Sequence, residues 1–360
     1  EETAYITTNG VDGGGDINIG TGDNSFEAVS VDVQEGSIID ASSLLTGDAG
    51  NISVWARLST LFSGFASARG GLLGGDAGSV YIGTKGNRLG FSGTVVMVAP
   101  SGAAGELTLQ ANRLNLVADG KANAPATLGE YVVRADKLAE VLTNSNVILT
   151  GGSGVYTFGD KKIDFRSYLT VPNLGLSTQL SQNGDLTINS PLFRVNRGGD
   201  VIMGESFLTL NTNQVDLNGK IYGSNETTMI GKDQFSSTTG LVNILSSFAS
   251  IQQGIDLIND EVNVDPAVNV NFGRYVENLI IDKEITLTGI GRDEARPAPI
   301  LEAADTNTPV VKVKVSNVTF DNFDVRAGEG TDERLAVRTV FAAPSKQIGL
   351  KAKGVSNTVV

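Results

Sequence analysis

The sequence repeats with a period of about 27 residues, and this repeat constrains the fold more than any other feature. The copies of its first motif are GDAGNISVWA at 47–56, GDAGSVYIGT at 75–84 and GAAGELTLQA at 102–111. Asn51, Ser79 and Glu106 occupy equivalent positions in these copies, 28 and 27 residues apart. An earlier copy, GGGDINIG, places Asp16 in the same position after a longer interval of 35 residues.

A second, weaker series lies between the copies of the first. Its members are GSIIDAS at 36–42, FSGFASA at 62–68, LGFSGTV at 89–95 and LNLVADG at 114–120. Their starting residues are 26, 27 and 25 positions apart. Two interleaved series with one shared period indicate a solenoid, in which each period forms one coil.

The repeats predict short β-strands that are buried on one face. Apolar residues alternate with other residues in each copy, as at Ile52 and Val54, and Gly, Asn, Asp and Ser separate the strands. We therefore predict an all-β fold, a right-handed parallel β-helix, in which Ile52, Val80 and Leu107 stack as one inward ladder. A Greek-key sandwich is the competing interpretation, but it predicts no fixed period.

Two segments interrupt the β pattern. Residues 134–143 and 241–259 carry apolar side chains at helical spacing, and both are predicted to contain helices. Within the second segment, Ser250 and Gln253 form a capping-box pattern, so a further helix is expected to begin at 251. These helices are interpreted as covers for an end or side of the coil, with a helical partner-binding surface as the alternative.

Three consecutive segments are expected along the chain. Residues 1–130 carry the regular repeats, 131–240 form β-helix with a helical insert and irregular loops, and 241–360 contain a helix followed by further coils. The last residues resemble a strand without a polar cap. We therefore expect the coil to continue beyond Val360.

Composition excludes several classes of function. The 360 residues include no Cys and no His, which excludes imidazole-based catalysis, disulfides and thiolate metal sites. With 27 basic and 40 acidic residues, the net charge of −13 argues against binding to nucleic acid or anionic membranes. No apolar run is long enough for a transmembrane helix, so no direct membrane insertion is expected.

The chain resembles two families of β-helical proteins. GSIIDASSLLTGDAGNISVWA, FSGFASARGGLLGGDAGSVYIGTKG and FSGTVVMVAPSGAAGELTL resemble filamentous-haemagglutinin-like adhesins, the exoproteins of two-partner secretion. This resemblance covers about residues 10–220, but the NPNG-type signature of the secretion domain is absent. From about residue 250 to the end, SIQQGIDLIN, GRYVENLIIDKEITLTGIG and VSNVTFDNFDV resemble the pectate-lyase-like β-helix superfamily.

Both resemblances imply a right-handed β-helix in an extracellular setting. The first also implies an outer-membrane secretion partner. Neither resemblance places a catalytic residue in this sequence.

Asp48 and Asp76 are the candidate metal-binding residues. The repeated Gly-Asp-Ala-Gly turns are expected to place them one coil apart, and two carboxylates at that spacing repel unless a cation such as calcium lies between them. The alternative is that each aspartate bonds the backbone of its own turn. The third copy has Ala103 at this position, which interrupts the row, so no cofactor is predicted and calcium is the alternative.

Trp55 and Tyr81 are the candidate ligand-binding residues. They lie near matching positions of successive repeats, offset by two residues, since Trp55 aligns with Gly83 and Tyr81 with Ser53. Exposed aromatic rings stacked along a coil could bind sugar rings. Ordinary packing of the two rings is the alternative.

Acidic residues near the C-terminus were considered for catalysis on polysaccharides. Asp321 and Asp324 are three residues apart and are predicted to point to opposite strand faces, which makes them a poor pair. Asp282, Lys283 and Glu284 adjoin a strand end and could line an outer face. Solvation is the simpler role for isolated acids at strand ends.

These observations favour an extracellular segment of a bacterial adhesin that takes part in cell adhesion or biofilm formation. Its expected partners are a polysaccharide or a cell-surface receptor. A carbohydrate-active lyase or hydrolase is the alternative, and it would need a groove in which acids and bases converge. A phage tail-fibre or tailspike segment is a third interpretation, and it would require a trimer.

Overall fold

The computed structural model shows an all-β protein built mainly from parallel strands, with two helices among the residues it describes. It describes residues 4–20, 27–119, 128–159, 161–171, 176–261, 265–291, 297–305, 307–326, 337–339 and 351–353. The chain forms two compact units. Unit 1 comprises residues 1–211 and 221–235, and unit 2 comprises residues 212–220 and 236–360.

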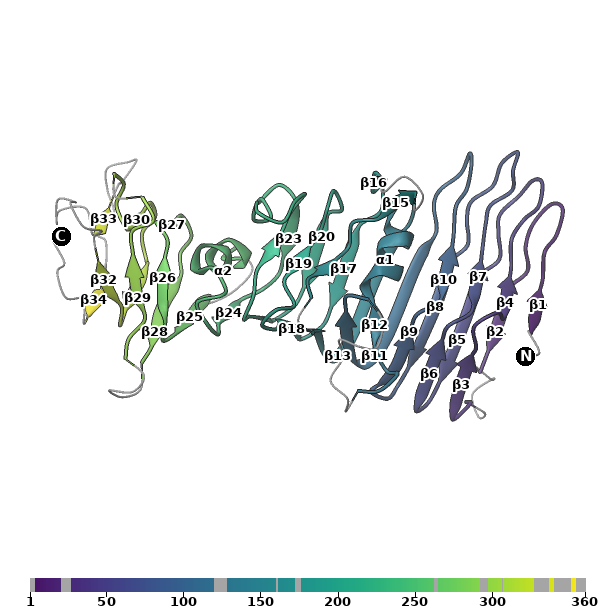
Figure 1. Ribbon diagram of the computed structural model, residues 1–360, viewed down its shortest axis with the longest axis horizontal. Coiled ribbons are helices and arrows are strands. Elements are labelled where there is room, and N and C mark those ends of the chain that lie inside the picture. The colour runs from purple at the N-terminus through teal and green to yellow at the C-terminus, as the bar shows by residue number, and fades with distance from the viewer. Residues whose placement is uncertain are drawn as a thin grey trace. The chain divides into compact units, whose positions relative to one another are not determined.

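A ladder of parallel strands runs through unit 1 (Figure 1). Its strands are β2 (Ile17–Ile19), β5 (Ile52–Ala56), β8 (Val80–Thr84), β11 (Glu106–Val117), β13 (Asn146–Phe158), β17 (Leu186–Asn189) and β20 (Leu208–Asn211). Ile52 pairs in register with Val80, and Val80 with Leu107, and all three are at most 1% exposed. The predicted inward ladder is therefore confirmed, and its core is aliphatic.

Two further parallel ladders complete the coils of this region. One contains β3 (Ser30–Val33), β6 (Ser59–Phe62), β9 (Arg88–Phe91), β12 (Val133–Arg134) and β18 (Leu192–Val195), together with the second halves of β11 and β13. The other contains β1 (Tyr5–Thr7), β4 (Ile38–Asp40), β7 (Phe65–Ser67) and β10 (Thr94–Val96). Phe62 and Phe91 pair in register and stack with ring centroids 6.0 Å apart.

The remaining strands of unit 1 are short. They are β14 (Ile163–Asp164), β19 (Val201–Ile202) and β22 (Ile221–Tyr222) in one parallel sheet, and β15 (Tyr168–Val171) and β16 (Leu176–Gln179) in an antiparallel hairpin. Strand β23 (Phe235–Ser237) lies at the division between the units.

The second repeat series was aligned incorrectly from the sequence. Ile38 pairs with Phe65 and Phe65 with Thr94, which are spacings of 27 and 29 residues rather than 26 and 27. Residues 114–119 do not continue this ladder. Their strand belongs to a different ladder, where Leu116 pairs with Val133 of the inserted β12. The glycine-rich turns differ in length between coils, and the motif alone does not reveal these differences.

Helix α1 (Ala135–Leu142) confirms the helix predicted within residues 134–143. Leu138, Ala139, Val141 and Leu142 form its buried face, which packs against β10, β11, β13 and β14. The helix therefore covers apolar strand residues of its own unit, as the sequence predicted.

Unit 2 repeats the same architecture with three parallel ladders. The first contains β21 (Gln214–Leu217), β24 (Leu241–Ile244), β25 (Ala267–Asn271), β28 (Thr286–Ile290), β31 (Thr319–Asp321) and β34 (Lys351–Lys353). The second contains β26 (Arg274–Val276), β29 (Ile300–Glu302) and β32 (Asp324–Arg326), and the third β27 (Leu279–Ile281), β30 (Val311–Val313) and β33 (Val337–Thr339). The predicted open end at Val360 lies outside the described residues.

The prediction of a helix across residues 241–250 is wrong. Val242 and Ile244 instead belong to β24, where they pair in register with Val215 and Leu217. Pairing within the ladder therefore outweighs the helical spacing of the apolar residues.

Helix α2 (Ile251–Leu257) confirms that a helix begins at 251, since the Ser250 side chain accepts a hydrogen bond from the backbone N–H of Gln253. Neither helix in the described residues is long and apolar enough to cross a membrane.

Side chains of the following coil hold both ends of α2. At the N-terminus, the Glu277 carboxylate accepts hydrogen bonds from Ser250 Oγ at 2.8 Å and from the backbone N–H groups of Ile251 and Gln252 at 3.0 and 3.1 Å. At the C-terminus, Lys283 Nζ donates to the carbonyl oxygens of Asp256 and Ile258. A negative charge at the N-terminus and a positive charge at the C-terminus both stabilise a helix.

Glu277→Gln is expected to lower the free energy of unfolding by about 2 kcal/mol, because the neutral amide replaces a charged acceptor of three hydrogen bonds. Chemical denaturation measures this loss, and hydrogen exchange of the α2 amides should quicken. Glu261→Gln, at an exposed position, is the matched control. Equal destabilisation by the two variants would contradict a capping role for Glu277.

Candidate functional site

The predicted metal residues connect neighbouring coils of unit 1. Asp48 Oδ1 accepts a hydrogen bond from the backbone N–H of Asp76 at 2.8 Å, and Asp76 Oδ1 accepts one from the backbone N–H of Ala103 at the same distance. The alternative prediction, that each aspartate hydrogen-bonds the backbone of its own turn, is therefore wrong, since these hydrogen bonds join successive coils. Each carboxylate reaches the next coil, because the turns lie one above the other.

These two aspartates provide few ligands for calcium, which takes six to eight oxygen ligands in proteins. The described part of the chain contains no group of three or more acidic side chains placed to hold a metal ion. The amide donors already occupy one oxygen of each carboxylate. The geometry thus supports a structural role for Asp48 and Asp76.

We expect neither calcium nor a chelator to change the melting temperature, since the Asp48 and Asp76 carboxylates are already stabilised by backbone N–H groups. Asp48→Asn should be almost neutral, because its amide oxygen can accept the same hydrogen bond, whereas Asp48→Ala should cost about 1 kcal/mol. Thermal unfolding with and without calcium measures both effects. A calcium-dependent rise in melting temperature that Asp48→Asn abolishes would instead show that Asp48 and Asp76 bind calcium.

Trp55 and Tyr81 stack on each other, with ring centroids 5.6 Å apart and an interplanar angle of 25°. Their predicted offset is confirmed, since Trp55 pairs with Gly83 and Tyr81 with Ser53. A side chain at Gly83 would place its Cβ 2.5 Å from Trp55 Cζ3, so the glycine leaves room for the indole ring.

The Trp55–Tyr81 pair is not the exposed platform that sugar stacking requires. Trp55 is only 9% exposed. Tyr81 is half-buried, its hydroxyl donates to Gln110 Oε1 at 2.9 Å, and burial raises its pKa to about 12. The contacts therefore support packing of the two rings against the sheet.

The acidic residues considered for catalysis do not converge. The prediction that Asp321 and Asp324 lie on opposite faces of one strand is wrong, since Asp321 lies on β31 and Asp324 on β32, which belong to different ladders of unit 2. Asp324 accepts a hydrogen bond from Arg326 Nε at 3.0 Å. Glu284 is exposed and accepts a hydrogen bond from Asn317 Nδ2 at 3.1 Å. These hydrogen bonds are typical of residues at strand ends and in turns, and they support a structural role for Asp324 and Glu284.

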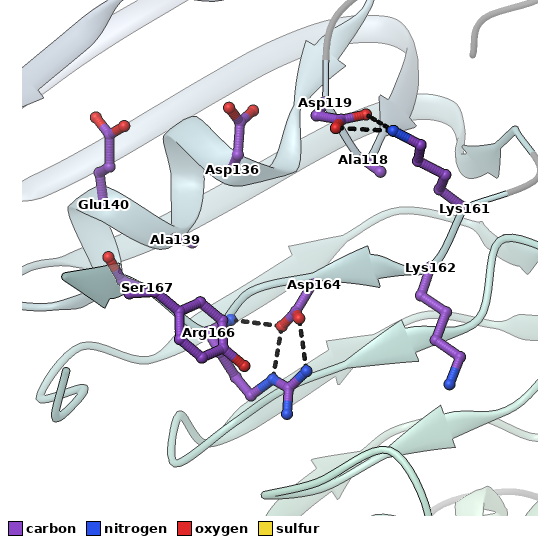
Figure 2. Close-up of a pocket in the computed structure, with 11 residues that line it drawn as sticks. Ala118, Asp119, Asp136, Ala139, Glu140, Lys161, Lys162, Asp164, Arg166 and Ser167 are labelled. Carbon is purple, nitrogen blue, oxygen red and sulfur yellow. Dashed lines mark hydrogen bonds and ion pairs between the residues drawn. The ribbon is translucent and has the colours of Figure 1, made fainter. Parts of the chain in front are cut away.

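A charged hollow that was not predicted from the sequence lies beside α1 in unit 1 (Figure 2). Its volume is about 380 Å³. It is lined by Ala118, Asp119, Asp136, Ala139, Glu140, Lys161, Lys162, Asp164, Arg166, Ser167 and Tyr168. Helix α1 places Asp136 and Glu140 along one side, and β14 with the residues after it places Asp164 and Arg166 along another.

Oppositely charged side chains neutralise one another around this hollow. Arg166 donates Nε and Nη2 to the two oxygens of Asp164 at 2.8 and 2.6 Å, and its Nη2 also lies 3.1 Å from Glu226 Oε1. Lys162 Nζ donates to Glu226 Oε2 at 2.8 Å, and Lys161 Nζ to Asp119 at 3.0 Å. Arg134 pairs with Asp136, and Lys137 with Glu140.

Hydrogen bonds and burial shift several pKa values at the hollow. Hydrogen bonds from Lys162 and then Arg166 lower the pKa of the Glu226 carboxyl, and the bond to Glu226 raises the pKa of Lys162. Burial raises the pKa of Tyr168. The lowered pKa keeps the Glu226 carboxylate ionised near neutral pH, where it holds its hydrogen bonds to Lys162 and Arg166.

The sequence contained only a weak signal for this hollow. The predicted helix identified Asp136 and Glu140, and the run KKIDFRSY at 161–168 is rich in charge. Glu226, however, comes from a segment 60 residues beyond Arg166, and no motif connects the two. No protein-family model matches the sequence, and no curated protein matches it.

Proposed function

We propose that this chain is an extracellular segment of a bacterial adhesin, in which stacked coils hold rows of side chains in position to bind a polysaccharide or a cell-surface receptor. The observation that carries the proposal is an outward row on unit 1. It consists of six half-buried residues that pair in register along six strands, with Tyr81 packed on Trp55: Ser53, Tyr81, Thr108, Ile148, Thr187 and Thr209.

The spacing of this row suits an extended ligand. Neighbouring strands lie about 4.8 Å apart, so the row spans roughly 24 Å. A polymer with repeating units can contact several coils at once, which raises its overall affinity without any deep pocket. The resemblance of residues 36–120 to filamentous-haemagglutinin-like adhesins supports the same function, an extracellular location and an outer-membrane secretion partner.

A glycan-binding screen combined with product assays tests this function. We expect the purified chain to bind one or more polysaccharides or bacterial surfaces without releasing reducing ends or unsaturated uronides. A failure to bind any polysaccharide or cell surface would contradict the adhesin. Turnover that disappears in Asp282→Ala or Glu284→Ala would instead identify a carbohydrate-active enzyme.

A further inference from the structure

The outer face of one ladder in unit 1 carries arginines stacked on aromatic rings. The guanidinium carbon of Arg113 lies 4.2 Å from the centroid of the Tyr156 ring and 5.6 Å from that of Phe158. Arg194 lies 5.9 Å from the same tyrosine ring. These distances are within the range of cation–π attraction.

Local sequence and strand pairing build this cluster. On β11, Leu114 and Leu116 are fully buried, so Arg113 lies on the opposite, outer face. Arg113 pairs with Gly154 across to β13, and a Cβ at Gly154 would lie 2.5 Å from Tyr156 Cε2. The glycine therefore allows the tyrosine ring to fold over its own strand toward Arg113.

A second arginine–aromatic pair joins β9 of the same ladder to Tyr131, which lies two residues before β12. Arg88, at the start of β9, is exposed, and its guanidinium carbon lies 5.5 Å from the Tyr131 ring centroid. Between β9 and β11, strand β12 ends at Arg134, which is already paired with Asp136.

The face is positively charged in an otherwise acidic protein. The segments 88–91, 113–117, 130–134, 154–158 and 192–195 contain four arginines and one acidic residue, Glu130, although the net charge of the chain is −13. Arg113 Nε donates to Asn115 Oδ1 at 3.0 Å. Within the described residues, Arg88 and Arg113 form no ion pair with a carboxylate.

We propose that this basic aromatic face, defined by Arg88, Arg113, Tyr131, Tyr156 and Phe158, binds an anionic polysaccharide. The inference rests on the proposed adhesin function and names its ligand class. Guanidinium groups recognise carboxylate or sulfate groups, and the half-buried rings offer surfaces on which sugar rings pack. Single-stranded DNA is the competing ligand, because its phosphates can pair with guanidinium groups and its bases can stack on aromatic rings, and the test must exclude it.

Binding to immobilised polysaccharides tests the proposal. The probes are polygalacturonate for carboxylates, dextran sulfate for sulfates, and neutral dextran and single-stranded DNA as comparisons. We expect binding to at least one of the first two, weakening as salt increases, and little binding to dextran. The two charged probes distinguish a carboxylate ligand from a sulfate ligand.

Arg113→Gln should weaken this binding about 10-fold, through loss of both the charged contact and the stacked guanidinium. Arg88→Gln should also weaken binding to the anionic polysaccharide. Because Arg88 is exposed, we expect this variant to fold normally even if Arg113→Gln destabilises the protein. Arg69→Gln, which follows β7 on another ladder, makes the same change in net charge and is the control.

Equal losses in Arg69→Gln and Arg113→Gln, or tighter binding to DNA than to either charged polysaccharide, would overturn the proposal. Binding only to neutral glycans or to cells, unchanged by Arg113→Gln, would also overturn it while leaving the adhesin function standing. Absence of binding to every glycan and cell surface would contradict both.

Discussion

Val80→Asp is expected to lower the free energy of unfolding by about 4 kcal/mol, because it places a carboxylate inside the aliphatic ladder. Val80 is fully buried and pairs in register with Ile52 on one side and Leu107 on the other. Neither neighbouring side chain offers a hydrogen-bond donor to the new carboxylate. Denaturant unfolding followed by circular dichroism measures the change.

Ser79→Asp provides the matched control for Val80→Asp. Ser79 is the residue before β8, and its side chain is exposed, so a carboxylate introduced at position 79 remains in water. We expect its effect to stay within about 0.5 kcal/mol. Similar losses for the two variants would show that position 80 does not face the core.

Gly78→Ala is expected to destabilise the protein by about 3 kcal/mol, because neighbouring coils approach too closely for a side chain. A Cβ at Gly78 would lie 2.0 Å from the carbonyl oxygen of Gly50, and a Cβ at Gly105 would lie 2.1 Å from that of Gly78. The last glycine of each of these two repeated turns, Gly78 and Gly105, therefore lies against the equivalent turn of the preceding coil. Thermal and chemical unfolding both report this loss.

Gly231→Ala tests whether the effect of Gly78→Ala is specific. The nearest atom to its added Cβ is Asp233 Oδ1 at 2.5 Å, the tip of a side chain that can rotate away. We expect a change of less than about 1 kcal/mol at this position. If Gly78→Ala proved as mild as Gly231→Ala, the close contact between successive turns would be refuted.

Much of the fold follows from the sequence because the inward positions repeat. Ile52, Val80 and Leu107 pair as the repeat predicts, since a slip of one residue would turn these side chains out of the core. The capping box at Ser250 correctly located the start of α2, because that contact is local. The handedness of the coil stays a prediction.

The sequence did not reveal features that depend on coil length. Along the chain, 40 residues separate Leu107 from its partner Val147, but only 22 separate Leu186 from Leu208. These variable turns bring β12 between β9 and β11 and place Glu226 beside Arg166. A fixed period does not predict such contacts, so the charged hollow and the basic aromatic face became visible only in the structure.

The proposed function depends on coils that stack in register, because only then do outward side chains form continuous rows. Cross-linking tests this stacking directly, since the chain contains no cysteine. Ser30 and Ser59 pair in register on β3 and β6, and Ser59 Oγ donates to Ser30 Oγ at 2.8 Å. In-register neighbours lie within disulfide range, whereas diagonal neighbours lie about 7–8 Å apart.

The decisive measurement is the yield of disulfide in Ser30→Cys/Ser59→Cys after mild oxidation, determined by thiol titration. Ser30→Cys/Leu61→Cys is the control, because Leu61 pairs with Asp32 and lies diagonal to Ser30. We predict nearly complete cross-linking of the first pair, unchanged on dilution, and little of the second. Equal yields, or a preference for the control pair, would contradict the stacked coils on which the proposed binding surface depends.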